Sequence, residues 1–222
     1  IHTLGQLNQI TSSLQTMTMS LRMVPIKSTF QKMLRLVRDL AKSSGKKVQL
    51  HMTGEETEID RNVVDELYEP MVHMIRNSVD HGLETPEERE QAGKSATGSI
   101  DLKAYHKGGN IVVEITDDGR GLNRDRILEK ARDKHLMADE TRLSDSEIYN
   151  LIFQPGFSTA QEITDISGRG VGMDVVKKAI ERLRGRVDIQ SLPGKGSTFF
   201  ISLPLTLAII EGMLVRVGDE RY

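Results

Sequence analysis

The most restrictive feature of this sequence is a long run of alternating apolar and polar residues, "GSIDLKAYHKGGNIVVEITDDG", at positions 98–119. Alternation places every second side chain on the same face of a strand, and the break "KGGN" between two such runs predicts a β-hairpin. "RVDIQSLPGKGSTFFISLPL", at 186–205, repeats the pattern around "PGKG", and "KKVQLHMTG" predicts a further strand. With helical segments between them, the hairpins predict an α+β fold: a two-layer sandwich of a mixed, mostly antiparallel sheet with helices on one face.

Apolar residues spaced by three and four positions predict the helices of this sandwich. We expect them at about 28–43, from 60 through "HMIRNSVDHG", at 123–134, from 144 onward, and at 173–184. Asp60 is expected to cap one helix start, and Ser144 another, in a capping box with Glu147. Gly185 is expected to close the last helix. Pro70 is expected to kink its helix or to shift the start of that helix.

The N-terminal residues carry a different pattern. Apolar residues recur there at the spacing of a heptad seam, at Leu7, Ile10, Leu14, Met17, Leu21 and Val24. The seam favours a helical hairpin or bundle with a partner, such as another copy of the chain, over a core-facing helix of the main domain. Both ends, "IHTLGQLNQI" and "LAIIEGMLVRVGDERY", look like the interior of larger elements, so we expect a fragment of a longer protein.

The composition bounds the possible functions. A chain of 222 residues, 37% of them hydrophobic, can form one sizeable domain. A formal net charge of −2 provides no electrostatic basis for binding nucleic acid. No apolar run is long enough to insert into a bilayer. The absence of cysteine excludes disulfides and thiolate chemistry, and it favours a reducing compartment.

Three glycine-bearing segments are candidates for a binding site: "DDGRG" at 117–121, "GRGVG" at 168–172 and "GKGS" at 194–197. A carboxylate of "DDGRG", at a strand end, can accept a hydrogen bond from an exocyclic amine, while the glycines leave room for a flat ring. "GRGVG" opens a helix, whose N–H groups favour a phosphate, although no Walker motif is present. Arg126 and Lys130 are either phosphate neutralisers or a solvated basic face.

The stretch "HMIRNSVDHG" places His73, Asn77 and His81 on one face of a helix, at 100° per residue. A zinc ion shared by the two histidines is excluded, because they lie about 12 Å apart along the axis. Asn77 offers a neutral oxygen of the kind that magnesium accepts when phosphates and water complete its shell. The stripe is therefore either one wall of a nucleotide pocket or a polar surface.

In chain order, "RNSVDHGLETPEERE", "DDGRGL", "FQPGFSTA", "SGRGVGMDVVK" and "GKGST" match the asparagine, glycine and phenylalanine boxes of histidine kinase ATP-binding domains. The chain resembles the chemotaxis sensor histidine kinases over essentially its whole length, within the superfamily that includes gyrase B, Hsp90 and MutL. The resemblance implies a Bergerat-type ATP-binding fold, with ATP as substrate and Mg²⁺ bound. It also implies three regions: the end of the dimerisation helices at 1–26, the catalytic domain at 27–205, and the start of an SH3-like receptor-coupling domain at 206–222.

The resemblance also implies a role for each matched residue. Asn77 would bind magnesium, Asp117 would accept from the adenine amino group, and His73 would lie near the γ-phosphate and assist transfer. Further ATP contacts would come from His81, Gly119, Gly121, Arg126, Lys130, Ser158, Gly168, Arg169, Gly170, Val171, Gly172 and Ser197. Residues 157–167 would form a lid over ATP. Ser197 stands where many relatives carry threonine, and it retains a hydroxyl near Asp117.

The implied partners are a phosphotransfer domain of the same protein, response regulators, and a coupling protein with chemoreceptors. The full protein would be a homodimer in the cytoplasm, held at the inner face of the membrane through receptor complexes. None of the six histidines in the sequence looks like a phosphate acceptor. The acceptor histidine is therefore expected on the phosphotransfer domain, outside this chain.

The choice between kinase and hydrolase depends on His73. Hydrolysing relatives carry a glutamate at this place, where a carboxylate can activate water. An imidazole there favours phosphoryl transfer to an incoming histidine. The alternatives are a hydrolysing ATPase of the same superfamily and a non-catalytic nucleotide-binding scaffold for receptor arrays.

Overall fold

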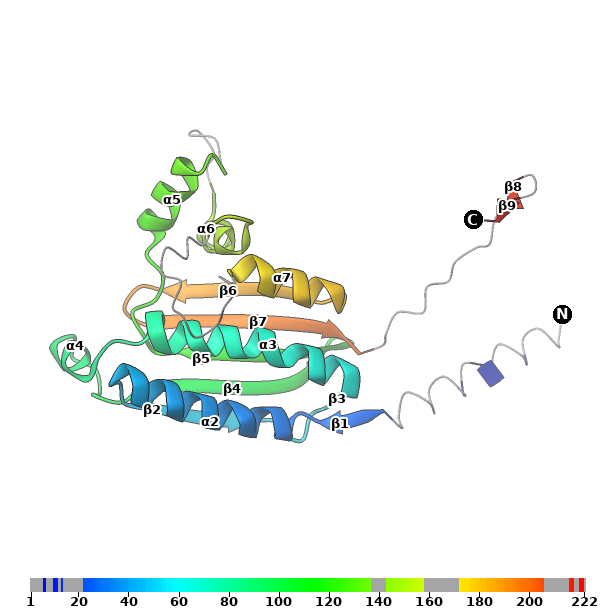
Figure 1. Cartoon of the computed structure of the whole chain (residues 1–222), viewed down its shortest axis with the longest axis horizontal. Helices are drawn as coiled ribbons and strands as arrows, with labels where there is room; N and C mark the ends of the chain where they lie inside the picture. Colours follow the sequence, from blue (N-terminus) through cyan, green and yellow to red (C-terminus); the bar gives the residue numbers. More distant parts are fainter. Residues whose placement is uncertain are drawn as a thin grey trace.

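A mixed five-stranded sheet organises the chain (Figure 1). The computed structural model describes residues 22–136, 143–157 and 172–205, together with the backbone at a few positions nearer the termini. The strands are β2 (Val48–Thr53), β4 (Gly98–Lys107), β5 (Asn110–Asp117), β6 (Arg186–Leu192) and β7 (Gly196–Pro204), in the order β2-β4-β5-β7-β6. β2 and β4 are parallel, and the other neighbours in this sheet are antiparallel.

Both predicted hairpins are confirmed. The β4–β5 turn lies at Gly108 and Gly109, whose φ angles of 57° and 75° fall in the left-handed region that glycine adopts without strain. Along β4, Ile100 and Leu102 are buried while Asp101 between them is half-buried. This alternation is the period of two that the sequence predicts for a strand with one face on the core.

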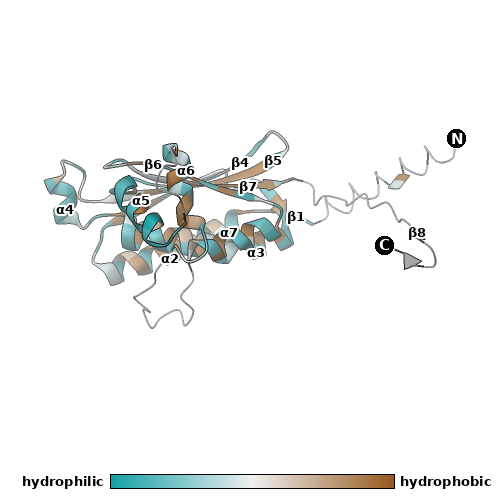
Figure 2. Cartoon of the chain, turned by 90° about the horizontal axis from the view of Figure 1, so that it is seen from above, coloured by the Kyte–Doolittle hydropathy of each residue, from teal (hydrophilic) through white to brown (hydrophobic). Residues whose placement is uncertain are grey.

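Helices cover one face of the sheet. α2 (Lys27–Ser44), α3 (Arg61–Asn77) and α7 (Met173–Arg182) pack side by side over it, as Figures 1 and 2 show. The other helical elements are α4 (Pro86–Gln91), α5 (Arg124–Asp133), α6 (Asp145–Asn150) and the 3₁₀ turn η2 (Leu151–Phe153). The predicted α+β two-layer sandwich is confirmed.

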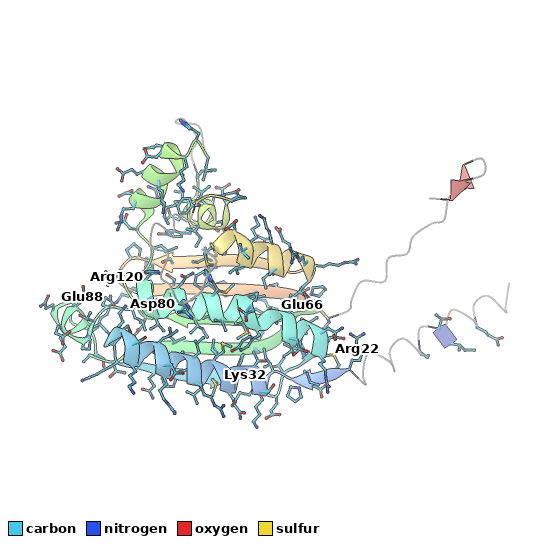
Figure 3. The ribbon with its side chains drawn as sticks, viewed as in Figure 1. Arg22, Lys32, Glu66, Asp80, Glu88 and Arg120 are labelled. Atoms are coloured by element: carbon cyan, nitrogen blue, oxygen red, sulfur yellow. The ribbon has the colours of Figure 1, made fainter. Side chains whose placement is uncertain are left out.

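The hydrophobic core lies between the two layers. Its largest fully buried apolar side chains include Phe30, Met33, Leu67, Met74, Ile100 and Leu102. Burying a side chain of this size contributes about 1.5–3 kcal/mol. On the outer side of the helices, the Lys32 Nζ lies 5.2 Å from the centre of the Tyr68 ring. Lys32 is one of the charged side chains that surround the fold in Figure 3.

The predicted helix starts are confirmed at two caps. The Asp60 carboxylate accepts a hydrogen bond from the Asn62 N–H at the start of α3. Ser144 and Glu147 form a capping box at the start of α6. Pro70 lies inside α3, which begins directly after Asp60, so the proline does not shift the start of the helix.

The end of α7 differs from the prediction. α7 ends at Arg182, and the residue with a left-handed φ, of 56°, is Arg184 rather than Gly185. A Cβ atom at Gly185 would lie 2.5 Å from the Leu203 Cδ2. Gly185 still helps to close the helix, because its N–H donates to the Ile180 carbonyl at 2.9 Å, and its lack of a side chain allows close packing against β7.

The predicted helix through residue 82 also requires a correction. α3 ends at Asn77, and Ser78–Gly82 forms a π-helix, η1. The Leu83 N–H donates to the Ser78 carbonyl at 2.7 Å, the i→i+5 bond of a π turn. The wider turn changes the angular relation between successive residues. His73 and Asn77 keep their α-helical spacing, whereas the step from Asn77 to His81 runs through the π turn.

The residues before α2 do not continue the heptad seam. β1 (Met23–Pro25) pairs with β3 (Glu58–Asp60), so Val24 belongs to a strand. Of the earlier seam, the structure describes Ile10, which is helical and exposed. Of the predicted coupling segment, it describes the backbone ladder of β8 (Arg216–Val217) with β9 (Glu220–Arg221). The other earlier seam residues and the rest of the coupling segment lie outside the described residues. The boundaries after residues 26 and 205 stay predictions. Among the described helices, none has the length and apolarity needed to cross a membrane.

Candidate functional site

A cavity of about 320 Å³ opens where η1, the ends of β5 and β7, α5 and the start of α7 converge. It is lined by Asn77, Ser78, His81, Gly82, Asp117, Gly121, Leu122, Lys130, Ile152, Phe157, Met173, Ser197 and Phe199. Many of these are the residues predicted to bind nucleotide. A second cavity, of about 460 Å³, lies between α6, α7 and β6, and none of the residues predicted to bind nucleotide lines it.

Asp117 is the buried carboxylate of this cavity, with 3% of its surface exposed. Its Oδ1 accepts from the Gly119 N–H at 3.0 Å, and its Oδ2 accepts from the Ser78 hydroxyl at 3.1 Å. Burial raises the pKa of Asp117, and these hydrogen bonds, with the Ser197 N–H, offset part of that effect. Because each carboxylate oxygen can accept more than one hydrogen bond, the group can still accept from a ligand.

Close contacts between main-chain segments surround Asp117. A Cβ atom at Gly119 would lie 2.2 Å from the Gly82 carbonyl oxygen. At Gly196, where φ is 107°, it would lie 1.9 Å from the Asp117 carbonyl oxygen. Gly121 has a φ of 69°, and a Cβ atom there would lie 2.5 Å from the Leu192 carbonyl oxygen. The predicted glycines are thus required by close approach of backbone, and Gly119 supports Asp117 from behind rather than lining the cavity.

Asn77 lies at the end of α3 with its amide in the cavity. The amide nitrogen donates to the Met173 Sδ at 2.9 Å, which joins α3 to the start of α7. The amide oxygen is a neutral, hard donor atom of the type that magnesium binds. The residue therefore fits the predicted magnesium site.

The Lys46 ammonium group binds the main chain at the π-helix η1. Its Nζ donates to the carbonyls of Val79, Asp80 and Leu83 at 2.7, 2.8 and 2.8 Å. Burial lowers the pKa of Lys46, and Asp80 partly opposes this. One ammonium group thus satisfies three carbonyls at the irregular end of the helix that carries Asn77.

His73 lies one turn before Asn77 on α3 and is half-buried. Burial and the nearby Arg76 lower the pKa of its imidazole, while Asp174 on α7 acts in the opposite direction. The imidazole is therefore neutral at pH 7. His73 is not among the described residues that line the cavity, so its predicted role in transfer stays a prediction.

We expect the His73 imidazole to titrate below its ordinary pKa of 6.5. Because the folded pKa is depressed, the neutral imidazole contributes stability that is complete above 6.5 and is lost as the pH falls through the folded value. Imidazole NMR signals followed against pH measure this, with His73→Gln to assign the signal. The urea-unfolded chain is the control, and a folded midpoint at or above the unfolded one would contradict the expectation.

Lys130 and Arg126 are both predicted to approach the phosphates, but they differ in their position relative to the cavity. Lys130 lines the cavity, and its Nζ is 5.2 Å from the centre of the Phe157 ring. Burial lowers the pKa of Lys130, and so do the charges of Lys134 and Arg126. Arg126 is exposed and is not among the described lining residues. The structure therefore brings one of the two predicted cations to the cavity.

Part of the predicted site lies outside the described residues: Ser158, Gly168, Arg169, Gly170, Val171 and the lid after Phe157. Gly172 is described. It is the N-cap of α7 and directly precedes Met173, which lines the cavity. The roles predicted for the 168–172 segment stay predictions.

Sequence analysis does not identify several lining residues, namely Ser78, Gly82, Leu122, Ile152, Met173 and Phe199. Ser78, Gly82, Leu122 and Met173 lie inside the quoted motifs, close to residues predicted to bind ATP, so adjacency is the signal that could identify them. Ile152 and Phe199 carry no comparable signal, because an apolar side chain within a helix or strand is buried in most folds.

These features define a class of protein. A two-layer sandwich with a buried carboxylate at a strand end, close-packed glycines around it and an asparagine on the facing helix is a nucleotide-binding domain. The chain belongs to the family of histidine kinase-, DNA gyrase B- and HSP90-like ATPases, whose model matches residues 63–207. That range contains every residue that lines the cavity.

Comparison with curated proteins identifies more specific relatives than the family model does. "Chemotaxis protein CheA" of Rhizobium meliloti (strain 1021) is 54% identical over 217 residues, which are 98% of this chain and 29% of that protein. The protein of the same name from Salmonella typhimurium is 51% identical over 222 residues, 100% of this chain and 33% of that protein. The chain thus spans about a third of the length of these relatives. A solved histidine kinase domain, from the blue-light activated histidine kinase of Erythrobacter litoralis EL346, covers 82% of this chain and 66% of its own, with a TM-score of 0.48 and 14% identity.

Proposed function

We propose that this chain is the ATP-binding catalytic part of a chemotaxis histidine kinase. The observation that carries the proposal is Asp117, a buried carboxylate inside the cavity that is suited to accept a hydrogen bond from the adenine amino group. The name of the relatives, chemotaxis protein CheA, supports it. The γ-phosphoryl group of ATP is transferred to a histidine on a separate phosphotransfer domain, which then phosphorylates response regulators.

The adenine end of the cavity is formed by β5, β7 and the turn after β5. Gly121 leaves room for the ring, and the apolar side chains of Ile152 and Phe199 line the same cavity. These groups remove the ring from water, which stabilises a bound base in proportion to the apolar area that is buried. Asp117 adds the directional contact that distinguishes adenine from other bases.

The phosphate end would lie toward Asn77, His81 and Lys130. Asn77 would hold magnesium through its amide oxygen, and magnesium when bound would neutralise charge on the phosphates. Lys130 is half-buried, which strengthens the attraction between its ammonium group and a phosphate. The backbone N–H groups of 168–172 would complete this end at the start of α7.

His73 favours transfer over hydrolysis. Since burial lowers its pKa, the imidazole is a weaker base than usual and is poorly suited to remove a proton from water. In transfer, the bond between the γ-phosphorus and its bridging oxygen breaks, a bond from the acceptor imidazole nitrogen to phosphorus forms, and ADP leaves. Such a reaction requires mainly positioning and charge stabilisation from the protein.

The described histidines do not compete as acceptors. His51 on β2, His106 on β4 and His135 after α5 are exposed, and none of them lines the cavity. His81 lines the cavity itself, beside the expected phosphates. We therefore propose that the acceptor is a histidine of the phosphotransfer domain.

Incubating this chain with magnesium, ATP labelled at the γ-phosphate and a phosphotransfer domain is expected to label that domain, whereas the chain alone is expected to retain no label. Acid-free electrophoresis measures both. A phosphotransfer domain with its acceptor histidine changed to glutamine is the control. Release of phosphate without labelling would instead indicate a hydrolysing ATPase. ATP binding without labelling and without release of phosphate would indicate a scaffold. Label retained on the chain itself would contradict an acceptor on a separate domain.

The same proposal includes the expected partners. A coupling protein and chemoreceptors would regulate transfer through the segment at 206–222, and the helices at 1–26 would pair with those of a second copy. These assemblies would form in the cytoplasm, at the inner face of the membrane. Closure of the lid on the nucleotide is a step that such coupling could regulate.

A further inference from the structure

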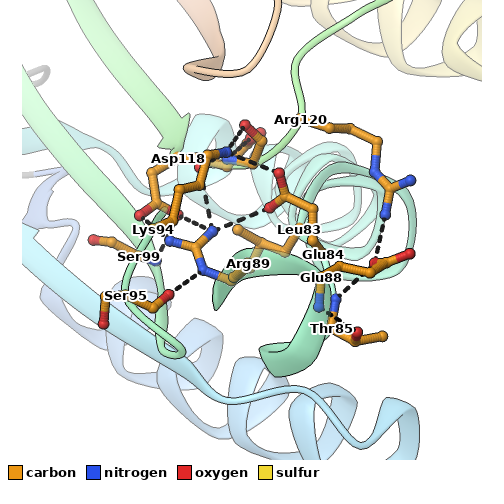
Figure 4. Close-up of polar contacts among 12 residues, drawn as sticks. Leu83, Glu84, Thr85, Glu88, Arg89, Lys94, Ser95, Ser99, Asp118 and Arg120 are labelled. Atoms are coloured by element: carbon orange, nitrogen blue, oxygen red, sulfur yellow. Dashed lines mark hydrogen bonds and ion pairs between the residues drawn. The ribbon is translucent and has the colours of Figure 1, made fainter. Parts of the chain in front are cut away.

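A partly buried cluster of charged residues lies next to the turn that follows β5 (Figure 4). Its members are Glu84, Arg89, Lys94 and Asp118. Arg89 is 2% exposed. A buried guanidinium requires partners on each side, because an unpaired charge in the protein interior is strongly destabilising. None of the four residues lines the 320 Å³ cavity.

Two cations and two carboxylates satisfy one another in this cluster. Arg89 Nη1 lies 3.1 Å from a Glu84 oxygen, and Arg89 Nη2 lies 2.7 Å from an Asp118 oxygen. Lys94 Nζ lies 2.8 Å from the other Glu84 oxygen. Burial acts to raise the pKa of Glu84, but Lys94 and Arg89 contribute to a net lowering. These ion pairs tie the segment around α4 to the turn after β5.

Lys94 also binds the backbone of that turn. Its Nζ donates to the carbonyl oxygens of Asp118 and Gly119, at 3.0 and 2.7 Å. The Asp118 carbonyl and the Gly119 N–H belong to one planar peptide unit. The Gly119 N–H donates to the Asp117 Oδ1. A single peptide group thus connects the Lys94 ammonium with the Asp117 carboxylate.

This connection affects Asp117 in two ways. A charged donor on the carbonyl polarises the peptide and strengthens its N–H as a donor to Asp117. It also fixes the plane of the peptide, and with it the orientation of the carboxylate whose other oxygen accepts from Ser78. Gly119 has no side chain that could hold the turn instead, since a Cβ there would collide with the Gly82 carbonyl.

We propose that Lys94 is a positioning residue for base recognition, which acts through the peptide between Asp118 and Gly119 to orient the Asp117 carboxylate toward the exocyclic amine of a purine. The inference rests on the proposed function, in which Asp117 accepts from the adenine amino group. Lys94 itself does not touch the nucleotide.

The test compares two ligands, ATP and purine riboside triphosphate, which lacks the exocyclic amine. The 222-residue chain is titrated with each by calorimetry, and the ratio of the two dissociation constants is the readout. A hydrogen bond to a charged group predicts a wild-type preference for ATP of about tenfold or more. Lys94→Met is expected to lower this preference about fivefold or more, while affinity for the purine analogue changes less than about twofold. Lys94→Arg, which keeps the charge, is expected to restore part of the preference.

Arg120→Gln is the matched control. Arg120 lies in the same turn, but its side chain forms an ion pair with Glu88 at 3.2 Å, and both side chains are about half exposed (Figure 3). This variant is expected to keep the wild-type preference. Thermal unfolding checks that each variant is folded. If Lys94→Met does not fold, Lys94→Gln, which is too short to reach both carbonyls, is expected to show the same loss of preference.

The outcomes separate the two proposals. A wild-type chain that binds ATP and the purine analogue equally would overturn the role of Asp117, and with it the proposed function of the site. A preference that is lost in Asp117→Asn but unchanged in Lys94→Met would overturn the role of Lys94 alone. Equal loss of affinity for both ligands in Lys94→Met would also overturn it, since a merely structural role predicts that result.

Discussion

Replacing Asn77 with aspartate is expected to lower labelling of the phosphotransfer domain about 10²-fold or more, while the chain remains folded. Two physical reasons support this. Aspartate cannot donate to the Met173 Sδ, so the contact that holds the amide between α3 and α7 is lost. The new carboxylate also places a negative charge at the end of the cavity where the phosphates are expected, and like charges repel strongly in a partly buried site.

Asn62→Asp is the matched control for this variant. Asn62 lies on the same helix but is exposed in its first turn, where a negative charge is favoured by the helix dipole. We expect wild-type labelling rates and an equal or higher melting temperature for this control. Wild-type labelling by Asn77→Asp would remove Asn77 from the proposed magnesium site.

Replacing Asp117 with asparagine is expected to weaken ATP binding about ten- to a hundredfold, the effect of losing a hydrogen bond to a charged acceptor. The same change is expected to leave the free chain as stable as before, or more stable. Burial raises the folded pKa of Asp117 above its ordinary 3.8. The stability that the group contributes is therefore complete below 3.8 and is lost as the pH rises through the folded value. At neutral pH the buried carboxylate is a cost that asparagine removes.

Calorimetric titration with ATP and urea unfolding at pH 7 measure the two effects of Asp117→Asn separately. Asp101→Asn is the control, since Asp101 is a half-buried residue of β4 away from the cavity. Unchanged ATP affinity in Asp117→Asn would contradict its role in base recognition. A large loss of stability without ligand would contradict the sign derived from its pKa.

Much of the fold can be predicted because strands and caps carry local signals. The alternation through 98–119 predicts β4 and β5 because one face of each strand is buried. Asp60 and Ser144 predict helix starts because their side chains satisfy free N–H groups there. The π turn at η1 is not predictable in this way, because Val79, its apolar residue, also fits the pattern of an α-helix. Despite this turn, His81 lines the same cavity as Asn77, whereas His73 is not among the described lining residues.

The motifs predict the centre of the site better than its surroundings. Asp117 and Asn77 lie in the cavity as expected, because each stands next to a structural boundary that the sequence marks. Arg126 is exposed and is not among the described residues that line the cavity. Helical spacing puts Arg126 and Lys130 on one face, but it does not show which of the two side chains reaches the cavity. Arg89 and Lys94 look like part of a solvated charged loop in "ETPEEREQAGK". Their burial depends on Asp118 and Gly119, more than twenty residues further along the chain.

The main-chain contacts around Asp117 also bear on how a competitive inhibitor of this pocket would be resisted. An inhibitor that hydrogen-bonds to Asp117 and lies against the turn at Gly119 and Gly121 meets backbone atoms, which a change of side chain cannot remove. At both glycines a larger residue would collide with another segment of the backbone, so such a substitution would damage the pocket for ATP as well. Resistance substitutions are therefore expected at the apolar lining residues, such as Leu122 and Ile152. Compounds that depend least on those walls should therefore keep their potency longest.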